Sequence, residues 1–202
     1  MKFSHLQKFL WALAGAAAIA FASVLLWTDA WRDVDRRVEE PAFRADFELT
    51  DHQGTVRSEE DFAGQWLLVF FGFTSCPDVC PTTLAEVAMV MDSLGDRAQQ
   101  VQSLFISIDP ERDTPAALAE FVPLFGADVI GLTGTPEQIA RTAESFHIFY
   151  EKIEQDAAPS GYTMAHSSQL FLFDPSGGYV TSWQYGTPAE SIVAELRGWV
   201  AG

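Results

Sequence analysis

The two cysteines of the chain lie four residues apart, and a proline follows each of them. They stand in the stretch Thr74-Ser75-Cys76-Pro77-Asp78-Val79-Cys80-Pro81. Two thiols at this spacing can exchange with a partner's disulfide, form a disulfide of their own or bind a soft metal ion. A purely structural disulfide is the weaker interpretation, because so short a loop would stabilise the fold by only about 2 kcal/mol. The pair therefore indicates thiol–disulfide exchange or metal binding.

The cysteines are expected in the turn between a buried strand and a helix. An apolar run at 66–73 precedes them and an amphipathic segment at 84–95 follows. Proline suits the first turn of a helix, and it disfavours helical conformation at the residue before it. We therefore expect Cys80 near the N-cap, where the helix dipole favours a thiolate. Asp78 opposes this effect and no basic residue lies in the motif, so the predicted lowering of the pKa is modest.

The rest of the pattern predicts an α/β domain. We expect a hairpin at 43–56, strands at 103–109, 129–133 and 168–174 with a hairpin partner at 179–185, a polar loop at 151–163, and helices at 115–125, 136–150 and 188–200. Thr114, Thr135 and Thr187 each precede a proline and are expected N-caps, two of them in capping boxes with Gln138 and Glu190. Parallel strands with crossover helices and cysteines at a β–α turn indicate a thioredoxin-like fold, here with three residues between the cysteines instead of two.

The N-terminal region predicts a membrane anchor. Residues 9–27 contain no charged side chain, and as a helix they would span roughly 28 Å, close to the hydrocarbon thickness of a bilayer. This divides the chain into a tail at 1–8, a transmembrane helix at 9–27, a linker at 28–42 and a domain at 43–202. The short tail favours a single-pass protein with its domain on the periplasmic or equivalent oxidising side. The alternative is a cleaved signal peptide with Ala20-Phe21-Ala22 as its cleavage site.

The formal net charge of −16 limits the possible partners. It argues against nucleic acid and against anionic membrane surfaces, both of which attract basic proteins.

Among the four histidines, His166 is the candidate to join the cysteines. It precedes the strand at 168–174, which in a thioredoxin-like sheet lies beside the central strand, so its loop can lie over the cysteine turn. His5 lies before the membrane span, and His52 and His147 are expected in a turn and on a helix flank. Two thiolates and an imidazole suit copper(I), or zinc and copper(II) with further ligands such as the Met164 thioether. Asp109, at the end of the second strand, is expected either to support a ligand by a hydrogen bond or simply to form a turn.

Three motifs together resemble the Sco/SenC family, and the likeness runs from about residue 43 to the C-terminus. They are Phe70-Phe71-Gly72-Phe73-Thr74-Ser75-Cys76-Pro77-Asp78-Val79-Cys80-Pro81, then Ser107-Ile108-Asp109-Pro110-Glu111-Arg112-Asp113-Thr114-Pro115, then His166-Ser167 before Phe171-Leu172-Phe173-Asp174-Pro175-Ser176-Gly177. The resemblance implies a membrane-tethered thioredoxin-like protein that binds copper through Cys76, Cys80 and His166. It also implies a role in assembling the binuclear copper centre of cytochrome c oxidase, with the copper-bearing subunit as partner and another copper carrier as a candidate second partner.

The chain departs from the family pattern at one position, where Ala165 replaces the usual aspartate before the histidine. The imidazole would then need another group to orient it, such as Asp109 or a backbone carbonyl. Two functions remain open. One is a copper chaperone rather than an enzyme, and the other is a membrane-tethered thiol–disulfide oxidoreductase that reduces the cysteines of a partner's copper site. Only the first needs His166.

Overall fold

The computed structural model describes Trp11, Phe21 and residues 43–126 and 128–200. The chain divides into two units, residues 1–41 and 42–202. Apart from Trp11 and Phe21, the expected tail, membrane anchor and linker at 1–42 lie outside the described residues. Within the part of the chain that the structure describes, no helix combines the length and apolar character that crossing a membrane requires.

The second unit is built on a seven-stranded sheet in the order β2-β1-β5-β4-β3-β8-β9. Its strands are β1 (Glu48–Asp51), β2 (Val56–Ser58), β3 (Trp66–Gly72), β4 (Val101–Ser107), β5 (Val129–Thr133), β8 (Leu170–Phe173) and β9 (Tyr179–Trp183). Strands β3, β4 and β5 are parallel, and β8 runs antiparallel to β3 on its other side. This arrangement confirms the thioredoxin-like plan and places the strand that follows His166 beside the central one.

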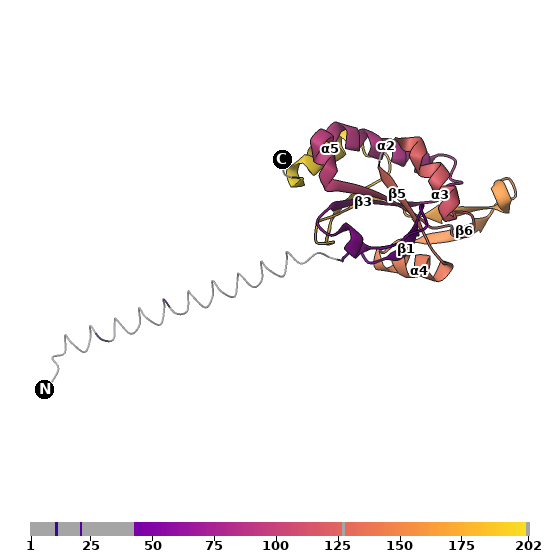
Figure 1. Ribbon diagram of the computed structural model, residues 1–202, viewed down its shortest axis with the longest axis horizontal. Helices are drawn as coiled ribbons and strands as arrows, with labels where there is room; N and C mark the ends of the chain where they lie inside the picture. The colour runs from indigo at the N-terminus through magenta and orange to yellow at the C-terminus, as the bar shows by residue number, and fades with distance from the viewer. Residues whose placement is uncertain (1–10, 12–20, 22–42, 127, 201–202) are drawn as a thin grey trace. The chain divides into compact units, whose positions relative to one another are not determined.

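Helices cover both faces of this sheet (Figure 1). Helices α2 (Val79–Leu94), α3 (Pro115–Phe121) and α5 (Ala189–Trp199) lie over one face, and α4 (Pro136–Ser145) lies over the other. Short 3₁₀ segments occur at η1 (Glu59–Phe62), η2 (Gly95–Gln100), η3 (Val122–Phe125) and η4 (Pro159–Gly161). Because β3 is covered on both sides, six of its seven residues are buried, which explains its unbroken apolar run.

Two of the three expected threonine caps are confirmed. The Thr114 side chain accepts a hydrogen bond from the Ala117 N–H, and Thr135 forms a complete capping box with Gln138. The prediction for Thr187 is wrong, because the N-cap of α5 is Pro188 and no side chain caps it. The Thr187 hydroxyl instead donates to the Gln184 carbonyl.

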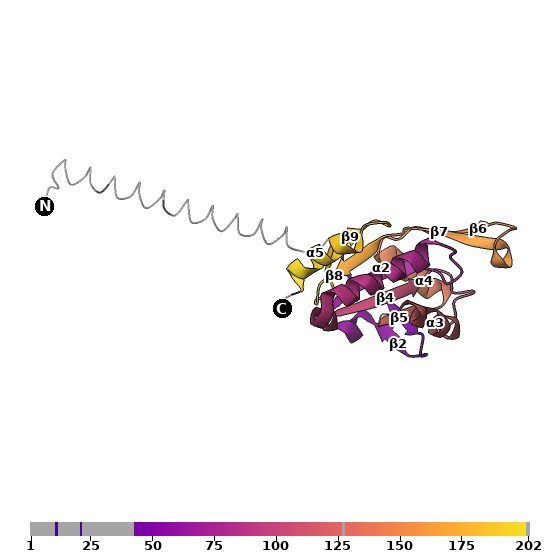
Figure 2. The same cartoon turned by 90° about the horizontal axis from the view of Figure 1, so that it is seen from above.

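The expected helix at 136–150 and polar loop at 151–163 are both corrected. Helix α4 ends at Ser145, and His147, placed on a helix flank, follows it with a positive φ of 54°. Strands β6 (Tyr150–Glu154) and β7 (Tyr162–His166) then form a hairpin that is a separate two-stranded sheet. Four of the five β6 residues are exposed, so the strand lacks the apolar alternation by which a strand is found in a sequence. Figure 2 shows this hairpin extending from the end of the main sheet.

Candidate metal centre

The cysteine turn connects β3 to α2. Cys76 lies in the turn, and Cys80 lies within the first turn of α2, whose N-cap is Asp78. Cys80 therefore lies near the N-cap as expected, while Pro81 is the third helical residue instead of the first. The helix can begin before Pro81 because the first four N–H groups of a helix have no intrahelical acceptor, so a proline there loses no hydrogen bond.

The two thiols are in contact but differ in exposure. Both are free, and the backbone N–H of Cys80 points at the Cys76 sulfur at 3.4 Å. Cys76 is half-buried, whereas Cys80 has no exposed surface. Gly72 makes room for the buried sulfur, because a Cβ atom at this position would lie 2.8 Å from the Cys80 Sγ.

The two thiols have very different pKa values. The hydrogen bond from the Cys80 thiol, helped by the backbone N–H groups of Asp78 and Cys80, lowers the pKa of Cys76 to about 4 despite partial burial. The same bond, together with burial, raises the pKa of Cys80 far above that of an ordinary thiol. The lowered pKa expected at Cys80 thus occurs at Cys76 instead. At neutral pH the pair is one thiolate and one thiol.

This difference predicts selective alkylation of Cys76. Because its folded pKa is about 4, the thiolate is already present at pH 6, and the rate should change little between pH 6 and pH 8. An ordinary thiol would gain roughly 100-fold in thiolate over that range. Mass spectrometry of the domain after brief iodoacetamide treatment measures both rates. Earlier labelling of Cys80, or a rate that climbs like that of an ordinary thiol, would contradict this assignment.

His166 reaches the cysteines from the end of β7. Its Nε2 atom lies 3.8 Å from the Cys80 sulfur. Its Nδ1–H donates to the Ser167 carbonyl at 2.9 Å, and because a carbonyl only accepts, this fixes the neutral tautomer with the Nε2 lone pair free. The rings of Phe70 and Phe73 meet the imidazole edge-on, at centroid distances of 6.2 and 5.9 Å. The imidazole is held as a metal-ligating histidine normally is, by a hydrogen bond from its other nitrogen.

The sulfur–nitrogen separation suits a shared ion. With metal–sulfur and metal–nitrogen bonds of about 2.3 and 2.0 Å, a trigonal ion would separate the two ligand atoms by about 3.7 Å. The observed Cys80–His166 separation is 3.8 Å. In residues 43–126 and 128–200, no group of three or more His, Cys, Asp or Glu side chains is already assembled as a metal site.

The alanine at position 165 does not leave the imidazole without an orienting partner. Successive side chains of a strand point to opposite faces, so Ala165 and His166 face opposite sides of β7. A carboxylate at 165 would therefore point away from the imidazole, whose orientation comes from the Ser167 carbonyl instead. Asp109 does not take over that task, because it accepts hydrogen bonds from Tyr162 and Arg112.

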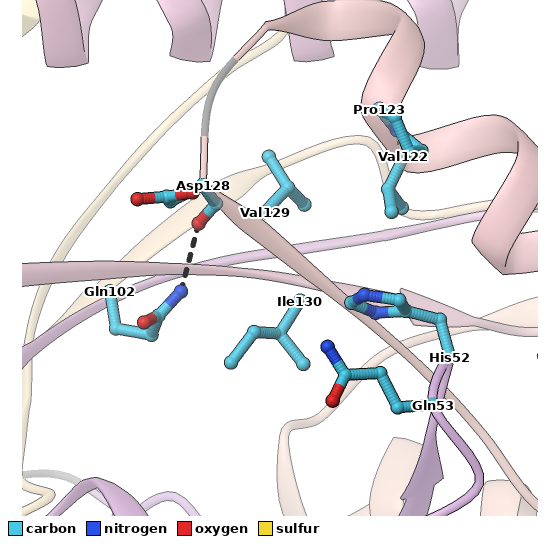
Figure 3. Close-up of a pocket in the computed structure, with 8 residues that line it drawn as sticks. All are labelled: His52, Gln53, Gln102, Val122, Pro123, Asp128, Val129 and Ile130. Atoms are coloured by element: carbon cyan, nitrogen blue, oxygen red, sulfur yellow. Dashed lines mark hydrogen bonds between the residues drawn. The ribbon is translucent and has the colours of Figure 1, made fainter.

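The other candidate residues contact different surroundings. Met164 lines a cavity of about 310 Å³ with Ile108 and Asp109. The His147 ring packs edge-on against Phe43 at 5.2 Å. His52 lines a cavity of about 380 Å³ next to β5 and the start of β4 (Figure 3), and its Nδ1 accepts the Gly131 N–H at 3.1 Å. His5 lies outside the described residues.

The domain is thioredoxin-like, and two thiols of different pKa lie at its β–α turn beside an oriented imidazole. These features define a class of redox-active or soft-metal-binding proteins. A model of the SCO1/SenC family matches residues 35–201, and the chain belongs to that family. The solved structure of BsSco, a member of the Sco family of cytochrome c oxidase assembly proteins, is 24% identical with a TM-score of 0.63, covering 80% of this chain and 96% of that one.

Individual relatives agree with this assignment. The mitochondrial SCO2 homologue of Bos taurus is 40% identical over 156 residues, which are 76% of this chain and 58% of the relative. The match thus spans about three fifths of that relative's length. ScoI of Bradyrhizobium japonicum, solved with copper bound, is 35% identical with a TM-score of 0.72, covering 78% of this chain and 99% of that one. Copper-bound ScoI of Arabidopsis thaliana is 34% identical with a TM-score of 0.72, covering 77% and 96%.

Proposed function

We propose that this chain is a membrane-anchored copper chaperone that holds one copper(I) ion through Cys76, Cys80 and His166. The observation that carries the proposal is that the Nε2 atom of His166 lies beside the Cys80 sulfur with its lone pair free. The lone pair is free because the Nδ1–H donates to the Ser167 carbonyl. Two sulfurs and one imidazole form a soft donor set, which favours copper(I) over harder ions. Family members with copper bound support the choice of metal.

Binding requires the Cys80 proton to leave, since the metal ligand is a thiolate and this thiol is the protonated member of the pair. Copper supplies the positive charge that offsets this cost, so uptake is expected to release a proton. The copper would then pass to the copper-bearing subunit of cytochrome c oxidase, the partner that family membership suggests. The predicted anchor at 9–27 would keep the domain on the oxidising side of the membrane, and another copper carrier could load it.

A second function is favoured by the unequal thiols. An accessible thiolate at Cys76 can attack a partner's disulfide, and the buried Cys80 can then resolve the mixed disulfide. The partner's cysteines gain two electrons and the Cys76–Cys80 pair becomes a disulfide. This reductase activity would need no imidazole, so it is distinguished from copper binding at His166.

The test is a competition titration of copper(I) against a chromophoric chelator. We expect His166→Ala to weaken copper binding about tenfold or more without abolishing it, because both sulfurs remain. The matched control is His147→Asn, which changes an exposed histidine at positive φ to a residue that tolerates this conformation. Equal affinity of the wild type and His166→Ala would remove the imidazole from the site and favour the reductase. The potential of the Cys76–Cys80 disulfide should stay nearly unchanged in His166→Ala.

A further inference from the structure

The loop at 109–113, between β4 and α3, contacts both segments that carry the proposed ligands. Its last residue, Asp113, has no exposed surface and faces the cysteine turn. The Asp113 carboxylate accepts hydrogen bonds from the Thr74 N–H at 2.9 Å and from the hydroxyls of Thr74 and Ser107 at 2.6 Å each. Thr74 lies two residues before Cys76, so this buried carboxylate fastens the start of the cysteine turn to the end of β4.

The first part of the loop fastens the histidine hairpin. The Tyr162 hydroxyl donates to Asp109 at 2.9 Å, and Arg112 donates to the Tyr162 carbonyl at 3.2 Å. The Arg112 guanidinium lies 3.8 Å from the centroid of the Tyr162 ring and is ion-paired with Asp109. Burial and the bond to Asp109 raise the pKa of Tyr162 to about 12, so its hydroxyl stays a donor at any physiological pH.

A second cation completes the contact from the hairpin itself. Lys152 on β6 lies 3.9 Å from the centroid of the same ring, and its ammonium pairs with Glu111 at 2.6 Å. Cation–π contacts with a buried ring contribute more to stability than exposed ion pairs such as Lys152–Glu111 do. Tyr162 is thus the main contact between the hairpin and the loop.

These contacts matter because the hairpin is not part of the main sheet. Strands β6 and β7 pair only with each other in the sheets that the structure describes, so no backbone ladder fixes their position over the cysteines. Tyr162 is the first residue of β7 and His166 is the last. Because β7 is only five residues long, contacts that fix Tyr162 also restrict the position of His166.

We infer that the loop at 109–113 is a positioning element for both halves of the site. Through Asp113 it holds the cysteine turn, and through Asp109, Arg112 and Tyr162 it holds the hairpin, so that it sets the separation between the sulfurs and the imidazole. The inference deepens the proposed function and rests on it where copper affinity is the readout. None of the four residues touches the metal, and each acts through a ligand.

The test is a double-mutant cycle of copper(I) affinity. Tyr162→Leu removes the ring and hydroxyl, and we expect it to weaken copper binding about tenfold, as loss of a group that orients a ligand does. In the His166→Ala background the same change should have no further effect, because it acts only through the imidazole. Asp113→Asn should weaken binding in both backgrounds, because it acts through the cysteine turn. Thr163→Val, on the other face of β7, is the control and should leave the affinity unchanged.

A measurement on the copper-free domain separates this inference from the proposed function. In Tyr162→Leu, amide hydrogen exchange in β7 should accelerate at least tenfold, while β3 and β4 stay protected as in the wild type. Tyr162→Phe, which keeps the ring and loses only the hydroxyl, should give a smaller acceleration and guards against a general folding defect. Unchanged exchange in β7, or equal losses of affinity in both histidine backgrounds, would overturn the positioning role. Equal copper affinity of the wild type and His166→Ala would refute the ligand set, and the exchange result would still decide the role of the loop.

Discussion

Cys80→Ser is expected to weaken copper(I) binding by more than about 100-fold, beyond the range for groups that only orient a ligand. The buried Cys80 sulfur is in contact with both the Cys76 sulfur and the His166 imidazole. A hydroxyl is a hard donor that does not ionise at neutral pH, so it cannot replace a thiolate on a soft ion. The substitution is nearly isosteric, and the fold should therefore persist.

The measurement is competition with a chromophoric copper(I) chelator, after a denaturation curve has shown that the variant is folded. Ser75→Ala is the matched control, because it removes a hydroxyl from the same turn and leaves both sulfurs in place. An affinity within about threefold of the wild type would show that Cys80 is not a ligand.

Phe146→Ala is expected to lower the free energy of unfolding by about 3–5 kcal/mol, the range for removing a buried phenylalanine. Phe146 has no exposed surface, and its ring meets those of Phe71 and Phe173 at centroid distances of 5.1 and 5.2 Å. It also contacts Phe43 and Phe47, each at 6.4 Å. The ring therefore joins β3 and β8 to the segment before β1, and its removal leaves a cavity among these rings.

Chemical denaturation of the two variants Phe146→Ala and Phe149→Ala measures this effect with a matched control. Phe149 lies three residues further along the chain and is 60% exposed, so its loss should change stability by less than about 0.5 kcal/mol. Similar destabilisation by the two variants would contradict the assigned core.

The inner strands of the main sheet could be predicted because they are buried on both sides. Four apolar runs correspond to β3, β4, β5 and β8, and the Thr-Pro pairs mark where α3 and α4 begin. These strands could be found in the sequence because a strand that is buried on both faces has apolar residues at successive positions.

The hairpin could not be predicted because its stability comes from contacts that leave no periodic trace. Lys152 and Tyr162 meet the charged loop at 109–113 rather than an apolar core. Nothing in a run of polar residues distinguishes such a strand from a loop until its partners are known.

Within the candidate site, residue types indicated the donors but not their arrangement. The spacing of Cys76 and Cys80 could not show which thiol is buried, because that depends on the room left by Gly72 and on where α2 begins. The acceptor that orients His166 is the Ser167 carbonyl, and a backbone group has no signature in a sequence. The motif Asp109-Pro110-Glu111-Arg112-Asp113 was a visible signal whose partners, Thr74 and Tyr162, only the fold could reveal.

In the proposed site, two sulfurs and one imidazole nitrogen hold one copper(I) ion. X-ray absorption spectroscopy of the reduced, copper-loaded domain tests it most directly, because the fine structure counts sulfur and nitrogen neighbours of the metal. The proposed site predicts two sulfur neighbours and one imidazole nitrogen in the wild type, with the imidazole signal absent in His166→Ala and retained in His147→Asn. A sulfur-only spectrum in the wild type, or an imidazole signal that survives in His166→Ala, would contradict it.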